Sequence, residues 1–179
     1  MKKTISILVL IVIAASCVFA GTHSVKASIT PYAFLGISSP EKSIKGIHNS
    51  YALGGNLGYE YKFDNNFIAG FDTKVKTNWF KDRTKNLTDI MFMAKAGYVF
   101  NLKDVDLYAN GEYGVGLQCF DGETSVLMPF GIEVGCTYGF TENWSAFGSL
   151  ENLYAFSKEN KVKFSNISLN TNLGVEYKF

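Results

Sequence analysis

The stretch that decides the fold is residues 51–79, which read YALGGNLGYEYKF, then DNN, then FIAGFDTKVKTNW. In residues 51–63 the odd positions are mostly aromatic or aliphatic, and the even positions are small or polar, among them Glu60. Residues 67–79 repeat the alternation, with charged side chains such as Asp72 on one face only. Alternation with period two is typical of a β-strand with one apolar face. The sequence therefore predicts two antiparallel strands joined by a tight turn at 64–66.

The same alternation recurs along the rest of the chain. It covers residues 29–37, 89–100, 105–118, 126–140, 144–154 and 166–179, so eight strands are predicted. Short links at 64–66, 101–104 and 141–143 alternate with longer polar links at 38–49, 81–87, 121–124 and 157–162. We therefore predict an all-β fold, an eight-stranded antiparallel up-and-down barrel with the short turns at one rim and the longer loops at the other.

The N-terminus has the features of an export signal. Lys2 and Lys3 precede an apolar stretch at 5–12, and Val18-Phe19-Ala20 offers small residues at the two positions that signal peptidase reads. We predict a signal peptide over 1–20 and one barrel domain over 21–179. An uncleaved anchor is the weaker alternative, because the apolar stretch is shorter than a membrane span. Lipidation at Cys17 is a second alternative, although the leucine usual in such sites is absent.

The composition agrees with a chain that needs an apolar environment. Hydrophobic residues make up 47% of the chain and charged residues only 18%, with 15 Phe, 10 Tyr, 17 Gly and 3 Pro. Removing Lys2 and Lys3 leaves 15 basic against 16 acidic residues, a net charge of −1. Such a balance gives no indication of nucleic-acid binding.

A repeated aromatic-x-Phe motif ends every second strand. Its copies are Tyr61 with Phe63, Tyr98 with Phe100, Tyr138 with Phe140, and Tyr177 with Phe179. All eight rings fall on the apolar face next to a short turn or the chain end. Aromatic residues gather in this way where a barrel meets the membrane interface. We therefore predict a periplasmic aromatic girdle.

Over residues 27–179 the chain resembles the small outer-membrane barrels of the OmpA transmembrane domain and OmpX type, which include opacity and porin-like proteins. The resemblance is strongest in the last strand, where Leu173, Val175, Tyr177 and the terminal Phe179 alternate. It implies an assembly signal in these four residues, recognition by the barrel assembly machinery, export through the periplasm, and a place in the outer membrane of a Gram-negative cell beside lipid and lipopolysaccharide. No peptidoglycan-binding domain is expected after Phe179.

A soluble lipocalin-like barrel would place the faces the other way round. Its interior would then have to hold the aromatic face, including Phe67, Phe71, Trp79 and the girdle. An eight-stranded interior has room for little more than its own side chains. We therefore predict that the charged face is the lumen.

Five charged residues are predicted to form a lumenal ion network: Lys74, Lys95, Glu112, Glu133 and Glu151. Hairpin geometry predicts four cross-strand pairs: Glu112 with Glu133, Glu133 with Glu151, Met93 with Glu112, and Lys74 with Met93. The favoured interpretation is an ion-pair network that compensates buried charge. The alternative is that clustered carboxylates share a proton or bind a cation.

Catalysis, cofactors and metal ligation by histidine and cysteine are not expected. His48 and Ser50 lie together in a predicted loop and His23 near the new terminus, without a serine, histidine and acid that the register would assemble. Cys119 and Cys136 have no metal-ligand spacing. A disulfide between them is also not expected, because Cys119 is predicted to pair near residue 126, about 33 Å from Cys136.

Two functions remain open. The first is a structural or surface-interaction protein, active in adhesion or envelope integrity, with a plugged, charged lumen and loops that meet lipopolysaccharide or a host ligand. Its basic loop residues are Lys42, Lys45, Lys81, Arg83, Lys85, Lys158 and Lys161. The alternative is a narrow, porin-like pore for small solutes or ions, left open by lumenal glycines. These are Gly54, Gly58, Gly70, Gly97, Gly114, Gly116, Gly131 and Gly135.

Overall fold

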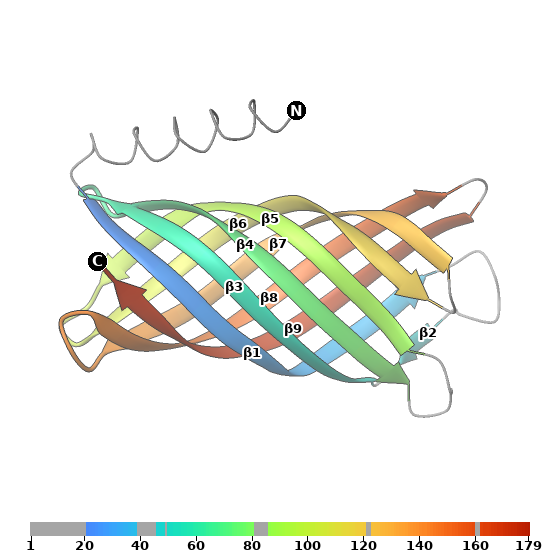
Figure 1. Ribbon diagram of the computed structural model, residues 1–179, viewed down its shortest axis with the longest axis horizontal. Helices are drawn as coiled ribbons and strands as arrows, with labels where there is room; N and C mark the ends of the chain where they lie inside the picture. Colours follow the sequence, from blue (N-terminus) through green and yellow to red (C-terminus); the bar gives the residue numbers. More distant parts are fainter. Residues whose placement is uncertain (1–20, 39–45, 49, 81–85, 121–122, 160–161) are drawn as a thin grey trace.

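Eight long antiparallel strands close into a barrel in the computed structural model (Figure 1). The structure describes residues 21–38, 46–48, 50–80, 86–120, 123–159 and 162–179. The strands are β1 (Gly21–Ser38), β2 (Gly46–His48), β3 (Ser50–Phe63), β4 (Phe67–Phe80), β5 (Asn86–Asn101), β6 (Val105–Phe120), β7 (Glu123–Gly139), β8 (Trp144–Glu159) and β9 (Val162–Lys178). β1 pairs with both β3 and β9, which closes the barrel, and the three-residue β2 adds only a short pairing to β1. The predicted fold class is confirmed.

The outer and inner faces follow the predicted alternation. Outward side chains are large and exposed, for example Leu53 at 59% and Phe71 at 56%, whereas inward residues such as Asp72 and Lys74 are buried. The inner wall therefore carries the charge. No helix among the described residues is long and apolar enough to cross a membrane.

β1 begins eight residues before the predicted 29–37. The register between β1 and β9 shifts between Ile29 and Tyr32, a bulge that contains Pro31. Proline donates no backbone hydrogen bond and is found at such irregularities. The bulge also changes which residues face inward, from even positions such as Lys26 to the odd position Ala33. Because the alternation breaks at this bulge, the sequence pattern did not predict the first half of β1.

The three short turns lie at one rim, as predicted. Asn66 adopts a positive φ of 66° in the turn between β3 and β4, a conformation that asparagine tolerates well. Two of the longer predicted links are wrong, because strand pairing continues to Phe120 with Glu123 and to Glu159 with Val162. Polar residues such as Glu123 therefore extend the strands instead of forming loops.

Three of the four predicted cross-strand pairs are shifted by two residues. Glu133 does pair with Glu151, but Glu112 pairs with Lys95 and Gly131. Lys74 pairs with Met91 instead of Met93. A shift of two keeps every side chain on its face, so the alternation is insensitive to the error. Register comes from turn geometry, which the sequence predicted less well than the faces.

Candidate functional site

The middle of the lumen holds a network of ion pairs centred on Lys74 of β4. Its Nζ lies 2.6 Å from Glu112 Oε2 and 3.8 Å from Asp72 Oδ2, and it also contacts Glu151 Oε1. These side chains are almost fully buried. One ammonium group thus bridges carboxylates of β4, β6 and β8, and β4 and β8 lie on opposite sides of the barrel.

A second set of ion pairs continues the network toward the short-turn rim. Lys95 of β5 lies 3.0 Å from Asp72 and 3.2 Å from Glu60, and Lys26 of β1 lies 2.9 Å from Glu60. Lys26 Nζ also stands 4.7 Å from the centre of the Tyr108 ring, which is cation–π distance. The pairs therefore connect side chains of β1, β3, β4 and β5 into the same network.

Among the described residues, Glu133 of β7 accepts hydrogen bonds only from neutral groups. Tyr108 donates its hydroxyl to Oε1 at 3.3 Å, and Asn110 donates its amide to Oε2 at 3.3 Å. Its cross-strand neighbour is Glu151, which accepts a hydrogen bond from Asn170 at 3.0 Å. Two buried carboxylates are thus adjacent, and only Glu151 contacts an ammonium group directly.

The structure brings the five predicted network residues into one belt around the lumen. The contacts that join them differ from the predicted ones. The sequence predicted lateral neighbours along the wall, whereas Lys74 reaches Glu151 from β4 to β8. It also left Lys26, Glu60 and Asp72 out of the network, although alternation placed the last two on the inner face. Contacts across a lumen link residues far apart in sequence, so no local pattern signals them. We call the eight residues the charged belt: Lys26, Glu60, Asp72, Lys74, Lys95, Glu112, Glu133 and Glu151.

An apolar layer fills part of the lumen on the loop side of the charged belt. Met91, Met93 and Leu153 form one buried cluster, and Leu127 and Pro129 on β7 are also fully buried inward residues. A polar lumen was predicted, and the structure adds this apolar layer to it. Its members lie on the inner face of the strands, and the sequence pattern placed Met93 there without predicting an apolar cluster.

The lumenal glycines are covered by neighbouring side chains. A Cβ atom on Gly114 would lie 2.8 Å from Met93 Sδ, and one on Gly131 would lie 2.7 Å from a Leu153 methyl. Near the rim, a Cβ on Gly135 would lie 2.6 Å from the Tyr108 hydroxyl. These glycines therefore make room for long side chains within a narrow barrel.

Two polar cavities lie inside the wall that the described residues form. A vestibule of about 90 Å³ near the short-turn rim is lined by three acidic residues, Glu60, Asp106 and Glu176, and by three basic residues, Lys26, Lys62 and Lys178. A smaller void of about 20 Å³ lies at the charged belt and is lined by Asp72 and Glu133 together with Lys26, Lys74 and Lys95. Lys26 and Tyr108 line both cavities, so these two side chains lie between them.

The predicted aromatic girdle lies at the short-turn rim. Its members are Tyr61, Phe63, Tyr98, Phe100, Tyr138, Phe140, Tyr177 and Phe179, and rings in three of the four pairs are in contact, with centroids 4.6–6.3 Å apart. Phe100, Tyr138 and Phe140 are more than half exposed on the outer face. Tyr61 differs from its expected exposure, because it is only 8% exposed and its phenol group lies against the Gly21 backbone.

The predicted assembly residues Leu173, Val175, Tyr177 and Phe179 lie on the outer side of β9 and at the chain end after it. The Phe179 amide donates to the His23 carbonyl oxygen at 3.0 Å, and the two rings stack at 5.8 Å. The His23 ring also hydrogen-bonds the Tyr59 hydroxyl at 2.6 Å. Sequence reasoning missed this contact between the first and last strands, because it treated His23 as lying outside the barrel.

The two cysteines of the described residues do not come together. Cys119 pairs with Thr124 instead of the predicted region near 126, and Cys136 pairs with Leu107 and Gly148; both are free thiols. The side chains of His48 and Ser50, the predicted signal peptide at 1–20 with Cys17, and the basic loop side chains lie outside the described residues.

A closed antiparallel barrel with an apolar outer face and a charged lumen defines the class of transmembrane β-barrels. The family profile described as outer membrane protein beta-barrel domain matches residues 5–179, and the chain belongs to that family. It is a protein of the Gram-negative outer membrane, and its outer face contacts lipid.

Solved structures of small outer-membrane proteins share this fold. Neisserial surface protein A is 20% identical, with 89% of this chain and 99% of that chain covered and a TM-score of 0.67. Ail, the attachment invasion locus protein of Yersinia pestis, is 20% identical over the same shares, with a TM-score of 0.51. OprG from Pseudomonas aeruginosa is 14% identical, with 90% and 97% covered and a TM-score of 0.50. A search of the curated proteins finds no match.

Proposed function

We propose that this protein is a non-conducting, non-enzymatic outer-membrane anchor that presents its loop rim to surface ligands. The observation that carries the proposal is the filling of the lumen by two different layers. The charged belt joins opposite walls through Lys74, and the apolar layer around Met93 follows on the loop side. A pore of eight strands would need open space where these side chains pack.

The narrow-pore alternative loses its main support. It depended on lumenal glycines leaving water-filled space, whereas Gly114 and Gly131 are covered by Met93 and Leu153. The solute would also have to pass the Lys74 contacts to Glu112 and Glu151, and breaking a buried pair costs about 3–5 kcal/mol.

The ligand chemistry that fits the loop rim best is anionic. The links at that rim carry Lys42, Lys45, Lys81, Arg83 and Lys85, five basic residues in two segments. One of the structural neighbours, Ail, has been crystallised in complex with the heparin analogue sucrose octasulfate. Lipopolysaccharide phosphates or a sulfated host polysaccharide would both meet such a rim, and recognition by the barrel assembly machinery through β9 is part of the same proposal.

Binding measurements on reconstituted protein test this function. We expect saturable binding of sucrose octasulfate that weakens as salt increases, because exposed charge pairs are screened. Replacing the five basic residues by glutamine should abolish binding, whereas Lys103→Gln and Lys178→Gln at the opposite rim should leave it unchanged. Equal binding by both variants would contradict the proposal. Vesicles with and without lipopolysaccharide distinguish a lipid ligand from a polysaccharide ligand.

A further inference from the structure

The barrel wall is interrupted between β1 and β3 in its loop-side half. Pairing of these strands ends at Thr30 with Gly54, and β1 pairs with β2 from Leu35 onward. Within the described part of the chain, residues 31–33 of β1 and 50–53 of β3 have no partner across this boundary. Each segment still pairs with the strand on its other side, β9 or β4, and Figure 1 shows β1 bending near its middle. One ladder of the barrel is therefore open over about 10 Å of strand.

The local sequence and register account for the interruption. Pro31 has no amide hydrogen, so it cannot donate a hydrogen bond to either neighbouring strand. Five positions separate Thr30 from Leu35 in β1, whereas six separate Gly54 from His48, their partners on the other side. An extra residue on one side of a ladder disrupts the pairing locally. The interruption is therefore a consequence of the chain itself.

The interruption faces lipid. Tyr32 and Leu53, one from each strand, are 50% and 59% exposed on the outer face. Backbone N–H and C=O groups without a partner are costly in hydrocarbon, and an open strand edge is not tolerated there. A polar group of a neighbouring molecule would therefore be stabilised at this position.

Two small side chains and an ammonium group lie behind the interruption. Ala33 and Ala52 are inward residues of the two open segments, and both are buried. Lys76 of β4 reaches past β3 and β1 to β9, where its Nζ donates to Ser168 Oγ and Asn170 Oδ1, each at 3.3 Å. Asn170 is the cross-strand partner of Ala33. The ammonium group therefore lies at the level of the interruption.

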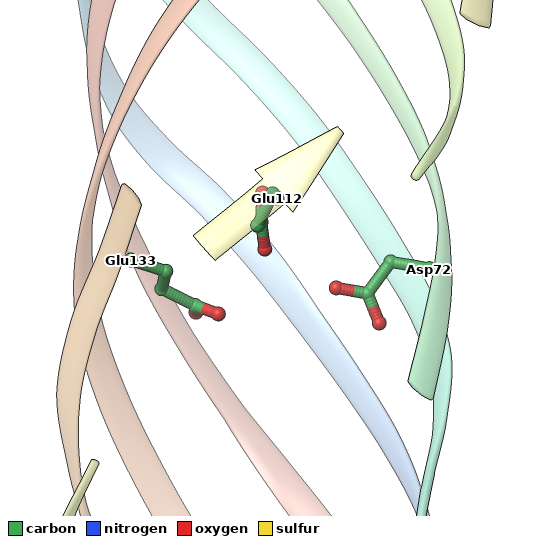
Figure 2. Close-up of side chains that lie close together, drawn as sticks. All are labelled: Asp72, Glu112 and Glu133. Carbon is green, nitrogen blue, oxygen red and sulfur yellow. The ribbon is translucent and has the colours of Figure 1, made fainter. Parts of the chain in front are cut away.

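Lys76 differs from the lysines of the charged belt in its partners. Lys74 and Lys95 contact carboxylates directly, and Figure 2 shows three carboxylates of that belt gathered in the lumen. Lys76 is equally buried, yet no carboxylate among the described residues forms an ion pair with it. Its cross-strand neighbour Asp89 accepts a hydrogen bond from Gln118 instead. An ammonium group has three donors, so Lys76 retains one for an anionic ligand, which would form a charge-assisted hydrogen bond.

We propose that the interruption between β1 and β3 binds one long-chain fatty acid, with its carboxylate on Lys76 and its acyl chain among the surrounding lipids. The negative charge matches the unpaired ammonium group, and the apolar chain stays on the lipid face. A ligand with a single chain is favoured, because pairing resumes on both sides and limits the opening to a few residues. Lys76 lies on the loop side of Met91, so the bound ligand leaves the apolar layer in place and the lumen closed.

Tryptophan fluorescence tests the site, because the two tryptophans lie at opposite ends of the barrel. Trp79 pairs with Tyr51 in the open segment of β3, whereas Trp144 begins β8 at the short-turn rim. Bromine atoms quench tryptophan at short range. We therefore expect dibromostearic acid to quench Trp79 saturably in refolded Trp144→Phe protein, and to leave Trp144 in Trp79→Phe protein without saturable quenching.

Two changes should weaken that binding. Lys76→Gln in the Trp144→Phe background should raise the half-saturating concentration by about tenfold or more, because a hydrogen bond to a charged group is lost. The methyl ester of dibromostearic acid keeps the chain but lacks the charge, and it should give no saturable quenching. If Lys76→Gln does not refold, Ala52→Leu tests the same site by adding bulk behind the opening, and it should also weaken binding.

The matched control is Lys62→Gln, since Lys62 lies at the opposite rim and bonds Asn101. It should retain the affinity of the parent protein. Absence of saturable quenching of Trp79, equal quenching of both tryptophans, or equal weakening in Lys62→Gln would overturn the proposal. Equal binding of the methyl ester would exclude a role for the carboxylate. Displacement by dodecyl phosphate but not by palmitate would overturn the fatty acid in favour of a phosphate-bearing lipid.

Discussion

The charged belt and the apolar layer fill the same lumen by different means. In the belt, Lys74 fixes carboxylates of β4, β6 and β8 by charge and geometry, so each partner depends on the others. In the apolar layer, Met91, Met93 and Leu153 occupy volume above glycines, without directional bonds. The comparison teaches that removing one member should be costlier in the belt, where buried charges lose their partner, than in the layer.

The largest effect is expected for Lys74→Met in the charged belt. It leaves Glu112 and Glu151 without their shared ammonium group, and breaking a buried pair from one side costs about 3–5 kcal/mol. Denaturant unfolding in lipid vesicles measures the loss. Lys62→Met is the matched control, since Lys62 bonds only the exposed Asn101 in the described contacts, and it should be nearly neutral. Equal losses in both variants would break the comparison.

A smaller loss is expected for Leu153→Ala in the apolar layer. Removing a buried leucine side chain costs about 2–5 kcal/mol, with the lower part of that range applying where neighbours can collapse. Flexible Met91 and Met93 adjoin Leu153, so partial filling of the cavity is expected. Leu150→Ala on the outer face, where Leu150 is 52% exposed, leaves no internal cavity and should cost less. The reverse order would contradict an apolar layer inside the lumen.

Adding volume to the apolar layer tests it from the opposite direction. An alanine at Gly114 places its methyl 2.1 Å from the Phe92 carbonyl oxygen and 2.8 Å from Met93 Sδ, so we expect a loss of about 1–3 kcal/mol. Gly111→Ala, three residues away on the outer face, meets only the Ala96 carbonyl oxygen at 3.9 Å. That variant should stay within about 0.5 kcal/mol of the unmodified protein. If Gly114→Ala is equally neutral, the layer is looser than its contacts indicate.

The smallest effect is expected outside the lumen, between Tyr98 of the aromatic girdle and its neighbour Phe67. Phe67 and Tyr98 meet edge to face, with ring centroids 5.4 Å apart. A double-mutant cycle with alanine at both positions should give a coupling free energy of about 0.5–1.5 kcal/mol. A coupling near zero would show that the rings act only through separate contacts with lipid.

Alternation with period two predicted most of the barrel, because one face meets lipid and the other the lumen. It failed where the period breaks, at the Pro31 bulge of β1, and where polar residues such as Glu123 extend a strand. Five of the eight residues of the charged belt were predicted, but most of the contacts that join them were not. The Lys74 contact with Glu151 crosses from β4 to β8 and joins residues 77 positions apart, so it depends on barrel closure and register.

Single-channel recording of the refolded protein in a planar bilayer tests the closed lumen most directly. We expect no stable unitary currents from the unmodified protein, because the charged belt and the apolar layer fill successive parts of the lumen. The triple variant Lys74→Gly, Met93→Gly, Leu153→Gly should conduct, because it removes the centre of the charged belt and two side chains of the apolar layer. Stable unitary currents in the unmodified protein, abolished by charge reversal at Glu133, would contradict a filled lumen and favour a pore.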